Sequence, residues 1–203
     1  MALSTYDELQ AAVADWLARE DLETQIIDFI TIGEARINRE LRVREMIETV
    51  TDTVSTQELA VPADFIETLQ FKINSDTPSP LEYRPVEDME RRTASETSGV
   101  PVAFSVVGTN FRLFPTPDGE YTYTLEYYKK VPALTADNQT NWLLSKAPDV
   151  YLYAALCEGA KFLMDDARIG YWDGLFRAAK TSLTAAEARA KRTSAPRRAR
   201  VLA

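Results

Sequence analysis

The sequence predicts an α+β protein in which helices from both ends of the chain form a bundle and an antiparallel β lobe is inserted between them. Apolar residues recur at helical spacing near both ends. Residues 48–133 instead hold short runs rich in β-branched and aromatic side chains, separated by turn residues. Helices on either side of a block of strands are typical of the α+β class.

Charge predicts an extended basic tail as a separate element. Of the 23 bases in the chain, six follow Glu187, the last acid, so that 17 bases face 31 acids in the body, a net charge of −14. Such asymmetry points to an interaction arm. The acidic body disfavours general nucleic-acid binding by the globular part, because it repels phosphates.

Residues 1–47 are expected to form an antiparallel pair of helices. Thr5 followed by Glu8 is typical of a capping box, which starts the first helix. The second helix is expected to begin near Glu23, after a break at Asp21 or Leu22. Each helix has one apolar stripe at helical spacing. The stripes comprise Leu9, Val13, Trp16 and Leu17 in the first helix and Ile26, Ile30, Ile37 and Leu41 in the second.

Residues 48–133 are expected to form the antiparallel β lobe, with a short helix near residues 86–92. Pro78 and Pro80 are expected to break the chain between strands. The last three strands are expected to form an antiparallel meander, because turn residues separate them. The predicted strands cover residues 48–54, 58–61, 65–73, 102–107, 111–114 and 121–130.

Residues 134–188 are expected to complete the bundle with two helices. The first has Pro148 in its first turn, where the missing amide hydrogen costs nothing, and runs to about Asp166. Gly170 is expected to separate it from a last helix over residues 171–191. The apolar stripe of the last helix comprises Leu175, Ala179, Leu183 and Ala186. Residues 189–203 are expected to form the basic C-terminal arm.

The residue types that support most catalysis and metal binding are missing. The sequence has no histidine, one cysteine, and neither of the common glycine-rich phosphate-binding patterns. We expect Cys157 to be a small buried apolar residue. We expect Asp165, Asp166 and Asp173 to be solvated acids at helix ends. These observations predict no enzymatic activity, no cofactor and no bound metal.

The sequence also lacks signals for membranes and secretion. The longest apolar run covers residues 150–157, far short of the ~20 residues that span a bilayer. The first eight residues have no basic start followed by an apolar block, so no signal peptide is expected. A single cysteine fits a reducing compartment.

Two interpretations of the strand over residues 121–130 remain open. Its aromatic side chains and terminal lysines suit stacking on single-stranded nucleic acid. They also suit a sheet whose aromatic face packs against a core or a neighbouring subunit, which the acidity of the body favours. The residues concerned are Tyr121, Tyr123, Tyr127, Tyr128, Lys129 and Lys130.

Several segments, in order along nearly the whole chain, resemble the head-to-tail adaptor proteins of tailed phages. The ordered series of segments carries the resemblance, and the N-terminal helix pair favours an adaptor over another ring protein of the same junction. The segments are residues 6–10, 15–22, 29–30, 34–42, 61–65, 113–117 with the following tyrosine-rich strand, and 148–156.

The resemblance implies a structural protein of the virion, made in the cytoplasm of the host bacterium and located at the portal vertex. Family members form a ring, typically of twelve copies, that docks beneath the portal protein. The ring extends the channel through which genomic DNA passes without sequence-specific binding. It also offers a platform to the next component, a tail, nozzle or tail-terminator protein. No membrane takes part.

The resemblance also implies that the C-terminal arm reaches the portal. Its bases would pair with portal carboxylates, and its two apolar residues would fill a small apolar site. The residues are Arg189, Lys191, Arg192, Arg197, Arg198, Arg200, Val201 and Leu202. The alternatives are a nucleic-acid-binding module that uses this arm and the tyrosine-rich strand, and a different ring protein of the neck or tail-completion class.

Overall fold

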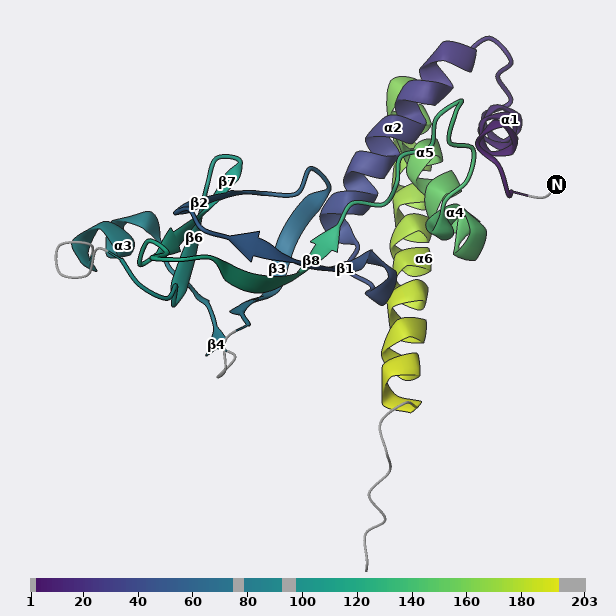
Figure 1. Ribbon diagram of the computed structural model, residues 1–203. Coiled ribbons are helices and arrows are strands. Elements are labelled where there is room, and N and C mark those ends of the chain that lie inside the picture. Colours follow the sequence, from purple (N-terminus) through teal and green to yellow (C-terminus); the bar gives the residue numbers. More distant parts are fainter. Residues whose placement is uncertain (1–2, 75–78, 93–97, 194–203) are drawn as a thin grey trace, which may run out of the picture. The chain divides into compact units, whose positions relative to one another are not determined.

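A computed structural model describes residues 3–74, 79–92 and 98–193 (Figure 1). The chain divides into two compact units. The helical unit comprises residues 1–45 and 131–203, and the β unit comprises residues 46–130. Helices and mainly antiparallel strands are both present, so the predicted α+β class is confirmed.

The helical unit begins with two helices, as predicted. Helix α1 (Tyr6–Leu17) starts at a capping box, in which Thr5 Oγ1 accepts the Glu8 amide and Glu8 Oε2 accepts the Thr5 amide, both at 3.2 Å. Helix α2 (Glu23–Glu40) follows. Both predicted stripes are buried except at Trp16, whose side chain remains half exposed beside Trp172.

Three helices complete this unit. They are α4 (Trp142–Lys146), α5 (Pro148–Phe162) and α6 (Asp166–Thr193). Helix α5 is central, because α1, α2 and α6 all contact it. The side chain of Leu17 in α1 packs directly on the backbone of α5: a Cβ added at Gly159 would lie only 2.8 Å from Leu17 Cδ1. Among the described helices, none is long and apolar enough to cross a membrane.

The predicted helix break at Gly170 is wrong, and the short helix α4 was not predicted. The chain turns instead at residues 163–165, where Met164 adopts the left-handed conformation with a φ of 55°. Asp165 then accepts the Arg168 amide at 3.2 Å and starts α6, so that Gly170 lies inside the helix. A polar cap therefore decides the boundary, and one glycine is tolerated within a helix.

The β unit consists of two four-stranded sheets. The strand order is β1-β8-β3-β4 in the first sheet and β2-β7-β6-β5 in the second. All pairs are antiparallel except β5 with β6. The strands are β1 (Ile47–Val54), β2 (Glu58–Ala60), β3 (Phe65–Ile73), β4 (Ser79–Pro80), β5 (Glu82–Tyr83), β6 (Ala103–Val107), β7 (Asn110–Phe114) and β8 (Tyr121–Lys129). A 3-10 turn, η1 (Arg44–Met46), precedes β1, and helix α3 (Val86–Arg92) follows β5.

The predicted meander is wrong in its last step. Strands β6 and β7 do form a hairpin, but β8 pairs with β1 and β3 in the other sheet. Strand β8 has nine residues, and β1 and β3 match nearly its whole length, whereas β7 has only five. Longer pairing satisfies more backbone hydrogen bonds. Of the two prolines that were expected to break the chain, Pro80 lies in the short edge strand β4, where a missing amide is tolerated, and Pro78 lies outside the described residues.

The two sheets share one apolar core. Alternate residues of β8, among them Tyr123, Leu125 and Tyr127, point into it. Opposite them, Phe104 of β6 and Phe111 of β7 lie with ring centroids 5.9 Å apart. The tyrosine face of β8 therefore forms part of the core of the β unit.

A polar strap closes the helical unit where the chain returns to it. We call residues 131–141 the strap. Asn38 Oδ1 of α2 accepts the Val131 amide at 2.8 Å, and Glu34 Oε1 accepts the Leu134 amide at 2.9 Å. At the end of the strap, Asn141 caps α4 by accepting the Leu144 amide at 2.8 Å.

Two buried side chains connect the strap to the rest of the unit. Asn141 donates to the Pro132 carbonyl and to the Tyr151 hydroxyl, each at 2.7 Å, and that hydroxyl donates to Glu34 at 3.2 Å. Burial raises the pKa of both Glu34 and Tyr151. The polar groups that the strap buries are therefore largely paired with one another.

Replacing Asn141 with alanine should lower the free energy of unfolding by about 2–4 kcal/mol, because α4 loses its cap and two buried groups lose their donor. Urea denaturation followed by circular dichroism measures the change. The matched control is Gln139→Ala, which removes a half-buried amide from the same strap and should cost less than about 1 kcal/mol. Equal losses for both variants would contradict the role given to Asn141.

Candidate functional site

The candidate site is the C-terminal arm, and α6 forms its root. Figure 1 shows the last turns of α6 extending beyond its neighbour α5. The predicted stripe is partly wrong: Ala179 and Leu183 are buried, but Leu175 is only half-buried and Ala186 is exposed. The aromatic residues Trp172 and Phe176 lie on the buried face instead. The observed buried stripe continues through Ala179 and Leu183 and ends at Glu187.

The first five residues of the predicted arm continue α6. Arg189 is exposed, two positions after Glu187. Lys191 and Arg192 lie in the last turn of the helix. The other predicted contact residues lie outside the described residues. They are Arg197, Arg198, Arg200, Val201 and Leu202.

Four charged residues gather at the arm's root, and we call them the root cluster: Arg44, Glu45, Lys146 and Glu187. Lys146 Nζ, at the end of α4, donates to Oε1 of both Glu45 and Glu187. Arg44 Nε lies 3.6 Å from Glu187 Oε2. Two segments far apart from α6 in the sequence, η1 and α4, are thus tied to it.

Charge pairing in the root cluster shifts two pKa values. The hydrogen bonds that Lys146 donates to Glu187 and to Glu45 raise the pKa of the lysine. Burial is the largest single effect on Glu45 and acts to raise its pKa, but the hydrogen bonds that its carboxylate accepts and the charges of Lys146 and Arg44 together outweigh burial, so that the net pKa is lowered. Lys146 and Glu45 are therefore both charged near neutrality. One oxygen each of Glu45 and Glu187 is buried without a hydrogen-bond partner, so the paired oxygens must compensate for that cost.

The acids near the ends of α5 and α6 do not form a metal site. Asp173 binds Arg36 at 2.5 Å and Arg177 at 2.8 Å, and the hydrogen bond from Arg36 is the main reason why its pKa is lowered. Asp165 starts α6 and pairs with Arg168. Within residues 3–74, 79–92 and 98–193, no group of three His, Cys, Asp or Glu side chains is placed to hold a metal ion.

Cys157 is 1% exposed, and burial raises the pKa of its thiol. The prediction of a buried small residue is therefore confirmed. A buried thiol with a raised pKa is a poor nucleophile, because the reactive thiolate is disfavoured.

Two of the four tyrosines of strand β8 are buried and are not available for stacking on bases. Tyr123 and Tyr127 are no more than 5% exposed, and the Tyr127 hydroxyl donates to Asp64 at 3.0 Å. Lys129 is paired with Glu48 at 2.6 Å. The core interpretation of this strand is confirmed at these two tyrosines, and the nucleic-acid alternative loses the support of these two side chains.

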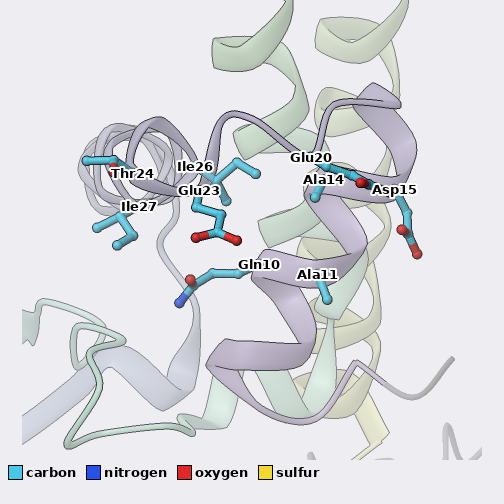
Figure 2. A pocket seen from close by; sticks show the side chains of 9 residues that line it. All are labelled: Gln10, Ala11, Ala14, Asp15, Glu20, Glu23, Thr24, Ile26 and Ile27. Atoms are coloured by element: carbon cyan, nitrogen blue, oxygen red, sulfur yellow. The ribbon is translucent and has the colours of Figure 1, made fainter.

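Two concave surfaces were not predicted. A pocket of about 610 Å³ lies between α1 and the start of α2, and Figure 2 shows Glu23 extending from α2 toward Gln10 of α1. A groove of about 770 Å³ lies in the β unit beside β3 and β6. Each of these two surfaces is lined by residues from separate helices or strands, so its shape depends on how those elements pack together. The sequence signal for the first was the acidic stretch that contains Asp15, Glu20 and Glu23.

Comparison with known proteins gives one family. A search of curated proteins found no match to this chain. The family model described as SU10 adaptor protein matches residues 4–200, nearly the whole chain. This match confirms the resemblance to phage adaptors on which the expected function rests. The chain belongs to the SU10 adaptor protein family.

Proposed function

We propose that this protein is the structural head-to-tail adaptor of a tailed phage. Copies form a ring that docks on the portal protein, extends the DNA channel and supports tail components. The family match over residues 4–200 is the observation that carries this proposal. An adaptor of this kind is a structural part of the virion, so the proposal includes no catalytic step.

The arm is the proposed contact with the portal. Arginine suits such a contact, because its guanidinium binds carboxylates through two parallel hydrogen bonds. One exposed ion pair is worth only about 0–1 kcal/mol. Several bases on one arm, repeated around a ring, add their contributions through avidity. The arm follows α6, a helix of 28 residues and therefore about 42 Å long, which gives it a rigid support.

The acidic body suits a channel for duplex DNA. A wall that bound phosphates would hold the genome in place, whereas net negative charge repels the backbone. The body carries 31 acids, and every base after Glu187 belongs to the arm. The proposed partners are therefore the portal protein, which binds the arm, and neighbouring copies of the protein in a ring of twelve. A tail, nozzle or tail-terminator protein binds the far side of that ring.

Ring formation is tested by native mass spectrometry of the complex with its portal. We expect twelve adaptors per portal ring, because ring closure follows the symmetry of the template. The adaptor alone, measured at the same concentration, is the control for self-association. A complex with only one or two adaptors would contradict the ring.

The arm is tested by charge reversal. The triple variant Arg197→Glu, Arg198→Glu and Arg200→Glu should weaken binding to portal about tenfold to a hundredfold per copy, and raised salt should weaken the wild type. Surface plasmon resonance on immobilised portal measures both effects. The matched control reverses three bases of the helical unit, Arg19, Arg39 and Arg168, and should bind portal as the wild type does.

Deletion of residues 194–203 separates the anchor from the nucleic-acid alternative. The truncated protein keeps every buried residue of α6 and should remain folded, but it should not attach to portal. Unchanged attachment would overturn the anchor. Loss of DNA affinity alone would favour the nucleic-acid-binding module.

A further inference from the structure

We propose that Lys146 and Glu187 are positioning residues for the arm. In this proposal the root cluster holds the last turns of α6 against the bundle and so sets the position of the arm's first residues. The importance of that position for portal binding rests on the function proposed above. The cluster itself can be tested without the portal.

Apolar packing of α6 ends before the helix does. Leu183 is the last buried apolar side chain of the helix among the described residues. From residue 184 to residue 190 every side chain is exposed except Ala185, which is half-buried, and Glu187, which is 7% exposed. A helical extension of this length is marginal in water without tertiary contacts. Glu187 is therefore the one buried side chain among residues 184–190 through which this part of α6 contacts the bundle.

A carboxylate in this position requires a cationic partner. Burial of an unpaired charge is strongly unfavourable, and the group would otherwise turn toward solvent. Lys146 provides the charge and bonds Glu187 and Glu45 at once. Arg44 Nε, at 3.6 Å from the second oxygen, adds a weaker interaction. Without Lys146, the buried carboxylate of Glu187 loses the partner that holds it against the bundle.

The cluster also connects the arm's root to two fixed points of the fold. Lys146 ends α4, and the first turn of that helix is capped by Asn141 of the strap. Glu45 is the last residue of the helical unit before the chain enters the β unit. The root is thus held by segments whose own positions are fixed by buried contacts, and a surface ion pair between mobile side chains would not have this effect.

Release of the root should weaken the arm without changing its contact residues. If α6 frays back to Leu183, residues 184–193 no longer support the arm as a helix. A longer flexible connection lowers the effective concentration of the arm at the portal, so each arm should bind several-fold more weakly. An equal change in every arm compounds around the ring.

Hydrogen–deuterium exchange of the full-length protein tests the cluster. In Lys146→Met and in Glu187→Gln, the amides of residues 184–193 should exchange at least tenfold faster, while those of α5 stay unchanged and show that the fold is intact. The double variant should exchange no faster than the faster single variant, because both changes break one interaction. Lys146→Arg keeps the charge and should preserve most of the protection.

The matched control is Lys180→Met on the same helix. This substitution removes the ion pair between Lys180 and Glu40, but Ala179 and Leu183 continue to bury that part of α6. Exchange of residues 184–193 should therefore stay within about twofold of the wild type. Equal acceleration in Lys180→Met, or no acceleration in Lys146→Met and Glu187→Gln, would overturn the proposal whatever the portal does.

Portal binding then separates the two proposals. The Glu187→Gln variant should bind portal several-fold more weakly than the wild type, with all arm residues present. One outcome is that Glu187→Gln accelerates exchange but leaves portal binding unchanged, while deletion of residues 194–203 abolishes portal binding. In that case the positioning role is wrong and the anchor stands. If that deletion is harmless, the anchor is wrong, and the exchange result still decides whether the cluster holds α6.

Discussion

The helical unit depends on hydrogen bonds that its side chains make to the returning backbone. Glu34 and Asn38 of α2 accept two amides of the strap, which begins where the chain leaves the β unit. A buried amide without an acceptor is costly, so these two side chains fix where the strap can lie. Asn141 then starts α4 at the strap's end, and α4 delivers Lys146 to the root of the arm.

Apolar packing and polar contacts have different roles in this unit. The buried residues of α5, among them Val150, Leu156 and Ala160, supply a general driving force for packing α1, α2 and α6 around it. Such burial allows many small shifts of one helix along another. The hydrogen bonds of Glu34, Asn141 and Lys146 allow few such shifts, because each bond requires its donor and acceptor at a set distance. Of these three groups, Lys146 is the one that bonds α6, through Glu187.

The sequence predicted the elements better than the way in which they combine. Local signals were sufficient for the capping box at Thr5 and for most strand positions, since they depend on neighbours within a few residues. The transfer of β8 to the other sheet depends on its length relative to β1, which no local pattern encodes. The start of α6 depended on Asp165 as a cap, and Gly170 was the stronger but misleading signal.

The same distinction explains why the basic residues of the site were visible in the sequence and its supporting cluster was not. Bases concentrated after the last acid are a property of composition, so Arg197 and its neighbours stood out at once. Glu187 was seen only as the last acid, since its meaning arises from Lys146, 41 positions earlier, and from burial of its side chain. A charged residue that closes an otherwise apolar helical face, as Glu187 does after Leu183, is the signal that points to such a cluster. Such a residue marks the position along a helix at which apolar packing ends and ion pairs begin to hold the helix in place.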